Sequence, residues 1–192
     1  MFIVLIGPDG SGKTRLAESL FSNFSNAVYF HYLPLTKNIN NFESITIEKK
    51  DESKNKLKVF FSIPKMILKL IFVNIICKVK FYKWNKEKKL IIGDRFLYNY
   101  YLDPQSLEYY SSKKVAKYFI EKVLLKPNLI FYLKATSNSI LSRKNELTKE
   151  QIEYFNKNAL DLDFKNLIFV DANNDFEIVL DEVTRKINEK YL

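Results

Sequence analysis

Eight residues near the start of the chain, Gly7 to Thr14, combine side chains and backbone flexibility that suit phosphate binding. Their sequence is GPDGSGKT, and it holds three of the four glycines found among 192 residues. Glycines let a backbone turn sharply and approach a ligand closely, so that successive N–H groups point at one anion. The spacing G-x-x-x-x-G-K-T adds a lysine and a hydroxyl at the end of the loop. We therefore predict a phosphate-binding loop.

Two side chains of this loop have predicted roles toward a nucleoside triphosphate. Lys13 would reach the β- and γ-phosphates, and the Thr14 hydroxyl would bind Mg²⁺. We expect Lys13 to be exposed at the loop. A chance glycine-rich turn is the alternative, and the complete spacing argues against it. The residues expected to contact ATP are Gly7, Pro8, Asp9, Gly10, Ser11, Gly12, Lys13 and Thr14.

The elements on either side of the loop fit this interpretation. Phe2 to Ile6 is an apolar run of strand length, and Lys13 to Phe24 repeats apolar residues at helical spacing. Continuous apolar strands that alternate with helices are typical of a parallel sheet covered on both faces. We therefore predict an α/β fold of the P-loop NTPase kind, a three-layer sandwich with a five-stranded parallel sheet and helices on both faces. The other predicted strands span residues 27–33, 89–93, 128–133 and 166–170.

Serines and prolines predict where further helices begin. Ser62 and Pro64 indicate the start of an apolar helix, and a serine at 111 or 112 would cap another that continues to about residue 125. Residues 35–58 are polar with little periodicity, which indicates a divergent surface excursion. A closing helix is predicted from about residue 175 to 190. Since no linker or repeat divides the chain, we expect residues 1–192 to form a single domain.

A break between two helices is predicted in the last third of the chain. Ser137 would cap the first helix, and Thr148 with Gln151 forms a capping box at the start of the second. Residues 145–147 therefore form a turn. Arg143 lies just before this turn, where its guanidinium could swing over phosphates bound at the loop. A solvated helix arginine is the alternative.

A second polar group of residues follows the strand predicted at 89–93. Asp94 and Arg95 lie where this strand ends, and Phe96 comes next. Because ligands of parallel sheets bind beyond the carboxyl ends of the strands, the pair is expected to face the phosphate loop. Asp94 would position Mg²⁺ or accept a proton, and Arg95 would hold an anionic acceptor with two hydrogen bonds. A surface pair that merely closes a loop is the alternative.

The order of these segments is informative. GPDGSGKT, the triplet Asp94-Arg95-Phe96, KPNLIFYL and SILSRKNEL occur here in sequence. This order resembles that of thymidylate kinase-like nucleoside monophosphate kinases. The segments DRFLYNYYLDP and SRKNELTKEQI are similar to patterns of a subgroup associated with bacterial surface-polysaccharide gene clusters. The resemblance covers nearly the whole chain and is weak between residues 35 and 88.

The resemblance implies ATP and Mg²⁺ as cofactors and a small molecule as phosphoryl acceptor. Asp9 resembles the carboxylate that contacts the acceptor's sugar, and Arg95 resembles the arginine that binds the acceptor's phosphate. Arg143, with Lys144, falls where these kinases carry a mobile lid, here near residues 143–148, with basic groups for the transferred phosphoryl group. The resemblance implies that the catalytic residues are Lys13, Asp94, Arg95 and Arg143. Thr14 and Asp94 would bind the metal ion, and Arg143 would also contact ATP. The acceptor would be bound by Asp9, Arg95 and Phe96.

Three departures from the family pattern concern the acceptor. Lys134 replaces an acidic residue, the lid region holds one arginine, and the residues that hold thymine have no match. A nucleoside monophosphate such as dTMP is the predicted acceptor, and a sugar, polyol or sugar phosphate of cell-surface polysaccharide synthesis is the alternative. A nucleotide-dependent switch is less favoured, because no glycine follows Gly93 to form an Asp-x-x-Gly element.

Bulk composition restricts partners and location. The net charge is +9, from 31 basic and 22 acidic residues, and the lysines are scattered along the chain. This spread indicates a compositional bias, so no nucleic-acid partner is expected. Cys77 is the single cysteine and no basic leader precedes the first strand, which favours a cytoplasmic protein. With one histidine, His31, we expect no His/Cys metal site beyond Mg²⁺.

The apolar stretch from Met66 to Trp84 has three interpretations. A core helix is favoured. A homodimer face comes second, because a helix that is apolar on more than one side must bury both sides. A membrane-surface helix with lysines reaching outward is least favoured.

Overall fold

The computed structural model describes residues 1–31, 56–94, 96, 98, 102, 117–118, 121–122 and 125–191; the side chains of residues 31, 56–63, 65, 66, 69, 70, 73 and 191 lie outside this description. Most of the excursion predicted at 35–58 therefore falls outside the described residues. The same holds for most of the helix predicted from 111 or 112 to about 125; of its described residues, 117, 118, 121 and 122 are helical and 125 is not.

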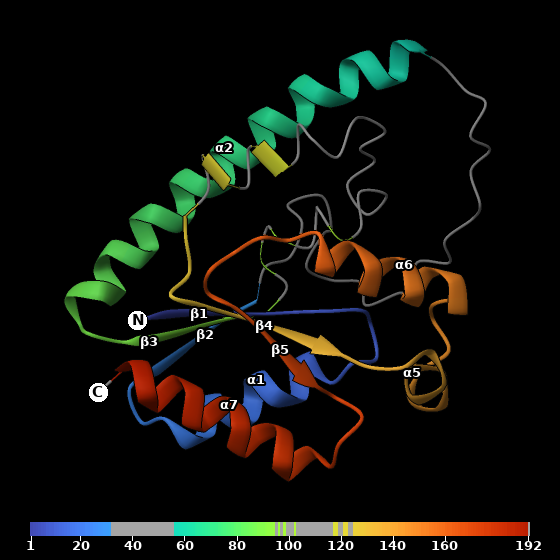
Figure 1. The fold of residues 1–192 in the computed structure, drawn as a ribbon. Helices are drawn as coiled ribbons and strands as arrows, with labels where there is room; N and C mark the ends of the chain where they lie inside the picture. Colours follow the sequence, from blue (N-terminus) through green and yellow to red (C-terminus); the bar gives the residue numbers. More distant parts are fainter. Residues whose placement is uncertain are drawn as a thin grey trace.

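Parallel strands alternate with helices along the described chain (Figure 1). The elements are β1 (Phe2–Ile6), α1 (Lys13–Asn23), β2 (Ala27–His31), α2 (Lys56–Lys86), β3 (Leu90–Asp94), β4 (Leu129–Lys134), α5 (Ser137–Arg143), α6 (Lys149–Leu160), β5 (Leu167–Asp171) and α7 (Phe176–Tyr191). The predicted five-stranded parallel sheet is confirmed. β1 has the predicted bounds, and β3, β4 and β5 each lie one residue further along the chain than predicted.

The order of the strands brings distant segments together at one edge. The sheet reads β2-β3-β1-β4-β5, with β1 in the centre. Leu5 of β1 lies opposite Asp94 of β3 and Phe131 of β4. Because all the strands are parallel, their carboxyl ends share this edge, where the loop after β1 and the end of β3 meet.

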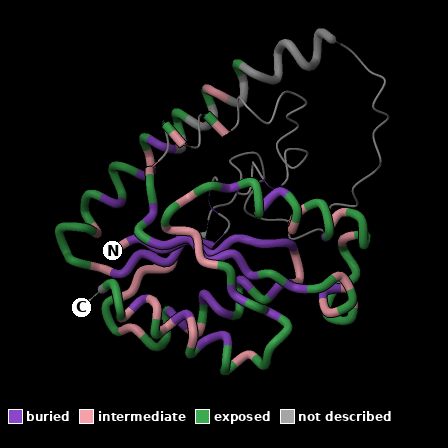
Figure 2. Tube along the Cα trace, in the orientation of Figure 1, coloured by how far each residue is buried: buried purple, intermediate pink, exposed green. Residues whose placement is uncertain are grey.

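Alternation along β1 explains why both faces of the sheet carry helices. Phe2 and Val4 pack into a core cluster with α2 and α6, whereas Ile3 and Leu5 pack into a second cluster with α1 and α7. Figure 1 shows these two helix layers on opposite sides of the sheet, and Figure 2 shows the buried strands between them. The predicted three-layer sandwich is thus confirmed.

The starts of two helices differ from the prediction. α2 begins at Lys56, so Pro64 lies inside the helix and not at its start. A proline inside a helix costs about 3 kcal/mol, but the eight residues before it contain no other helix breaker, so nothing ends the helix there. α5 is capped by Thr136 and not by Ser137, because Thr136 keeps an extended backbone while its hydroxyl accepts a hydrogen bond from the Ser139 N–H.

The predicted break between helices is confirmed. α5 ends at Arg143, and α6 begins after Thr148, whose hydroxyl accepts from the Gln151 N–H while the Gln151 side chain accepts from the Thr148 N–H. This is the predicted capping box. In the part of the chain that the structure describes, no helix is both long and apolar enough to cross a membrane.

Candidate functional site

The loop that joins β1 to α1 has the backbone that its glycines predict. All three have a positive φ: Gly7 at 146°, Gly10 at 87° and Gly12 at 91°. Gly10 also needs space, because a Cβ there would lie 3.0 Å from Cγ2 of Ile140 in α5. Gly12 caps α1 without a side-chain hydrogen bond, so the N-terminal N–H groups of that helix have no capping side chain. Such a helix start carries a partial positive charge that favours an anion.

Lys13 lies folded against its own loop. Its Nζ donates a hydrogen bond to the Pro8 carbonyl at 2.6 Å and lies 3.5 Å from the Ser11 Oγ. The Asp9 carboxylate is 3.6 Å from the same ammonium. Only 3 % of Lys13 is exposed, so the prediction of an exposed lysine was wrong. Lys13 is buried for an electrostatic reason, because its ammonium interacts with acceptor oxygens of the loop itself.

The loop and the end of β3 are joined by a hydrogen bond between side chains. The Thr14 hydroxyl donates to Oδ2 of Asp94 at 3.0 Å, and Asp94 is fully buried. The sequence indicated that these two residues would share one edge of the sheet, and the structure brings them together. Both offer hard oxygen atoms of the kind that Mg²⁺ prefers. The described residues contain no cluster of three or more His, Cys, Asp and Glu side chains suited to a metal ion.

Tyr29 belongs to this group of side chains, and sequence reasoning missed it. Its hydroxyl donates to the same Asp94 Oδ2 at 3.1 Å, from β2 on the far side of β3. In the sequence Tyr29 is one of several aromatic residues of an apolar strand. Only the strand order places it beside the carboxylate, so no local signal could have identified it.

Arg143 and Lys144 lie at the end of α5 beside the loop. The Lys144 Cβ would be 3.4 Å from a Cβ at Gly10. The Arg143 guanidinium, however, donates to the Ala172 carbonyl after β5 at 3.1 Å. Lys144 pairs with Glu146 at 2.9 Å. The basic residues of the predicted lid are thus far from the loop in sequence and close to it in space, but their charged ends bind other protein groups.

Phe96 was predicted to bind the acceptor, but its ring lies in the core. Phe96 is fully buried, with its ring 5.2 Å from the ring of Phe2, so it fixes the chain after β3 and has no surface for an acceptor. The physical reason is that an aromatic ring at this position gains more from the core than from solvent. Arg95 lies outside the described residues. Lys134 is exposed at the end of β4.

A side-chain network joins the loops that follow β4 and β5. The Asn173 Oδ1 accepts hydrogen bonds from the Thr136 N–H at 2.9 Å and from the Thr136 hydroxyl at 3.1 Å. On the same side, the Arg15 guanidinium lies 3.8 Å above the ring of Phe176, which links α1 to the start of α7. These contacts link the segments that surround the loop between β1 and α1.

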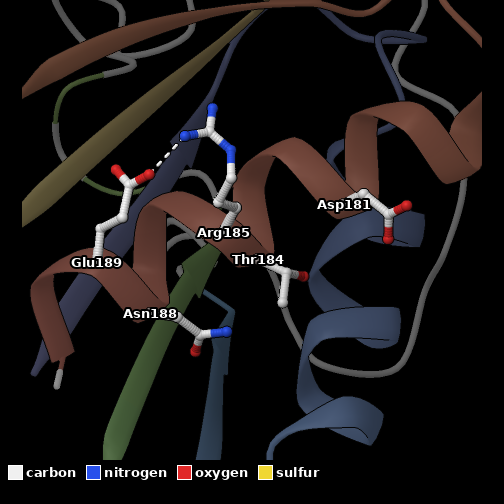
Figure 3. Close-up of a pocket in the computed structure, with 5 residues that line it drawn as sticks. All are labelled: Asp181, Thr184, Arg185, Asn188 and Glu189. Carbon is white, nitrogen blue, oxygen red and sulfur yellow. Dashed lines mark hydrogen bonds and ion pairs between the residues drawn. The ribbon is translucent and has the colours of Figure 1, made fainter.

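A shallow hollow on α7 lies apart from this site. It is lined by Asp181, Thr184, Arg185, Asn188 and Glu189, all on one helix. Figure 3 shows Arg185 paired with Glu189 one turn further on. This is a surface ion pair between neighbouring turns, and such pairs contribute little. The ion pair with Glu189 therefore explains the position of Arg185 without a ligand.

Comparisons with known proteins bear on the fold. No family model and no curated protein matches the sequence. A solved thymidylate kinase from Candida albicans has a TM-score of 0.70 at 17% identity, covering 100% of this chain and 93% of that one. A deoxyadenosine kinase from M. mycoides with bound dATP has a TM-score of 0.55 at 19% identity, covering 98% and 100%. At these identities the likeness shows a P-loop kinase-like fold.

Proposed function

We propose that this chain transfers the γ-phosphoryl group of ATP to a small acceptor. The observation that carries the proposal is the hydrogen bond between Thr14 and the buried Asp94, directly behind a glycine-rich loop that contains Lys13. A hydroxyl beside a carboxylate at the start of a helix is an arrangement suited to a nucleotide and its divalent cation. The fold shared with thymidylate and deoxyadenosine kinases supports the same conclusion.

The residues of the loop would act by binding and neutralising phosphates. The N–H groups of the loop and of the first turn of α1 would hold the β-phosphate. Lys13 would leave the Pro8 carbonyl and place its ammonium between the β- and γ-phosphates. Thr14 and Asp94 would hold Mg²⁺, which supplies neutralisation of phosphate charge when bound. Positioning and charge are the main requirements of phosphoryl transfer, so these groups would supply most of the rate enhancement.

Two arginines would complete the site. Arg95 follows Asp94 directly, so its guanidinium would bind the anionic acceptor. Arg143 would exchange the Ala172 carbonyl for the transferred phosphoryl group when ATP is present. Asp9, beside Lys13 in the loop, would contact the sugar of the acceptor.

A nucleoside monophosphate is the proposed acceptor, with dTMP the first choice. It rests on Asp9, on the pair Asp94-Arg95 and on the helix break after Arg143. The exposed Lys134 at the end of β4 favours a second candidate, a sugar or polyol phosphate of the kind used in surface-polysaccharide synthesis. Its positive charge would suit an additional anionic group on the acceptor.

A panel of acceptors tests the proposal. Purified protein is incubated with ATP and Mg²⁺ and with each nucleoside monophosphate, and products are followed by ³¹P NMR. We expect one pyrimidine deoxynucleotide to be preferred, since a site that hydrogen-bonds one base rejects others by about 10⁴. The Lys13→Ala variant is the control. Weak, uniform transfer with intact ATP binding would move the proposal to sugar and polyol phosphates, and no ATP binding at all would overturn it.

The role of Arg95 has its own test. Arg95→Ala should weaken acceptor binding more than ATP binding, and loss of a charged bidentate contact lowers kcat/KM by about 30- to 1000-fold. ATP affinity is measured separately by calorimetry. If only ATP affinity fell, the arginine would belong to the other substrate.

A further inference from the structure

Arg15, an arginine beside the phosphate loop, is held by an aromatic ring and not by an anion. It lies in the first turn of α1, one residue after Thr14, and its side chain is exposed. Its guanidinium lies 3.8 Å above the ring of Phe176, the first residue of α7. Within the part of the chain that the structure describes, the guanidinium makes this contact and no hydrogen bond or ion pair.

The other two arginines of the described chain bind protein oxygen atoms. Arg143 donates to a backbone carbonyl, and Arg185 pairs with a glutamate one turn further along α7. Arg15 forms no such pair, although the carboxylates of Glu18 and Asp175 belong to neighbouring residues of α1 and of the ring. A guanidinium that stacks on a ring uses its face, so the N–H groups at its edge can still bind an anion.

The start of α1 is an unfavourable place for positive charge in the absence of an anion. The first turn of a helix carries a partial positive charge, and acidic residues are preferred there. α1 has no acidic residue in this turn and holds two cations, Lys13 and Arg15. The ring of Phe176 offsets part of the repulsion, because its face attracts a cation. A bound anion would relieve the rest.

The strand order indicates which part of a nucleotide Arg15 would meet. β3 lies on one side of the central strand β1, whereas β4 and β5 lie on the other side. The Thr14 hydroxyl turns to Asp94 at the end of β3, and its neighbour Arg15 turns to Phe176 after β5. In an in-line transfer the γ-phosphate faces the acceptor, proposed here beside β3, and the rest of the donor extends away from it. Arg15 therefore lies on the side of the donor that does not react.

We propose that Arg15 binds the α-phosphate of the donor nucleotide and that Phe176 is the positioning residue that holds its guanidinium. The inference rests on the proposed transfer from ATP and adds a residue that recognises the donor. Lys13 and the N–H groups of the loop would hold the β- and γ-phosphates, which leaves the phosphate next to the ribose for the neighbouring cation. Guanidinium and phosphate form strong, charge-assisted hydrogen bonds.

Steady-state kinetics provide the first test, because the α-phosphate keeps all its bonds during the transfer. Arg15→Gln should raise the KM for ATP by about 10- to 100-fold and lower kcat by much less. Arg185→Gln is the matched control. It removes the same charge from an exposed arginine about two and a half turns further along α7 than Phe176, and it should change the KM for ATP by less than about twofold, since salt screens a distant charge.

Thio-substituted nucleotides locate the contact on one phosphate. ATPαS carries a sulfur in place of one oxygen of the α-phosphate and exists as two diastereomers, and sulfur accepts hydrogen bonds weakly. Calorimetry without acceptor should show that the wild-type protein prefers one diastereomer of ATPαS and that Arg15→Gln loses most of this preference. The preference between the diastereomers of ATPβS should be the same in both proteins, because Arg15 would not contact the β-phosphate.

The role of Phe176 is tested by a double-mutant cycle. Phe176→Leu keeps an apolar group against α1 but removes the face of the ring. It should weaken ATP binding by less than Arg15→Gln does, and it should have no further effect on ATP affinity in the Arg15→Gln protein. A purely structural ring would lower the melting temperature in both proteins and leave ATP affinity unchanged, which would contradict the positioning role.

The outcomes separate this inference from the proposed function. A wild-type protein that binds no ATP would overturn the proposed function, and the inference with it. If the wild type binds ATP and Arg15→Gln binds it equally well, the inference fails and the proposed function stands. Equal losses in Arg15→Gln and Arg185→Gln would also overturn the inference, because the overall charge would then attract ATP. A loss confined to the KM of the acceptor would place Arg15 on the opposite side of the site.

Discussion

The loop edge of the sheet and the outer side of α2 depart from ordinary burial in opposite directions. At the loop edge, Lys13 and Asp94 are almost completely removed from solvent. On α2, Phe72 and Tyr82 are more than half exposed. A buried charge and an exposed aromatic ring each cost free energy in the isolated chain, so each indicates a use beyond folding. The buried charged groups at the loop edge indicate a ligand, and the exposed apolar groups on α2 indicate a partner.

The largest expected effect is on the free energy of unfolding, and it distinguishes the buried side of α2 from its exposed side. Phe81 is 2 % exposed and its neighbour Tyr82 is 63 % exposed. Phe81→Ala should lower the free energy of unfolding by about 3–5 kcal/mol, whereas Tyr82→Ala should change it by about 0.5 kcal/mol or less in the single chain. Urea titrations at low protein concentration measure both. Similar losses would mean that the outer side of α2 is covered within the chain.

Loss of the buried ammonium should strongly reduce activity without unfolding the protein. Lys13→Ala should reduce kcat by about 100- to 1000-fold, because a charge that stabilises the transition state is removed. The fold should survive, since the Pro8 carbonyl also accepts a hydrogen bond from the Ser11 N–H at 3.2 Å. Turnover and thermal melting are measured on one preparation. Undiminished turnover would remove the loop from the site.

Alanine variants of two loop glycines can separate the cost of steric crowding from the cost of backbone strain at a positive φ. Gly10 and Gly12 have nearly equal φ, but a Cβ at Gly10 would meet Ile140 at 3.0 Å while one at Gly12 would meet nothing within 4 Å. Both alanine variants should lose about 1–2 kcal/mol from strain, and Gly10→Ala should lose about 1 kcal/mol more. Chemical denaturation of the two variants gives the difference. Equal losses would show that α5 moves away without cost.

The smallest effect concerns the hydroxyl that sequence reasoning missed. Tyr29→Phe removes one hydrogen bond to Asp94 and should lower kcat/KM by about fivefold, equivalent to about 1 kcal/mol. Tyr132→Phe removes a hydroxyl that donates to Asn156 at 2.8 Å and should affect stability but not turnover. Steady-state kinetics at several Mg²⁺ concentrations distinguish the two. An unchanged Tyr29→Phe enzyme would make that contact structural only.

Local patterns in the sequence predicted the elements better than the contacts between them. The apolar run Phe2 to Ile6 and the Thr148–Gln151 capping box depend on residues close in the chain, so both were predicted correctly. The partner of Asp94 on β2 depends on strand order, which a local pattern does not contain. The family resemblance placed Phe96 at the acceptor, yet its ring belongs to the core. The position of a residue along the chain predicted that it lies at the edge of the sheet. The direction of its side chain could be found only from the folded structure.

The internal hydrogen bond of Lys13 sets a threshold for any ligand of the loop. The ammonium leaves the Pro8 carbonyl at 2.6 Å only for an acceptor that offers more negative charge than a peptide oxygen and the nearby Asp9 carboxylate provide. A single phosphate offers less of this compensation than a chain of two or three. The loop would therefore discriminate by the length of the phosphate chain, and affinity should rise steeply from AMP through ADP to ATP, before any contact with the base is made.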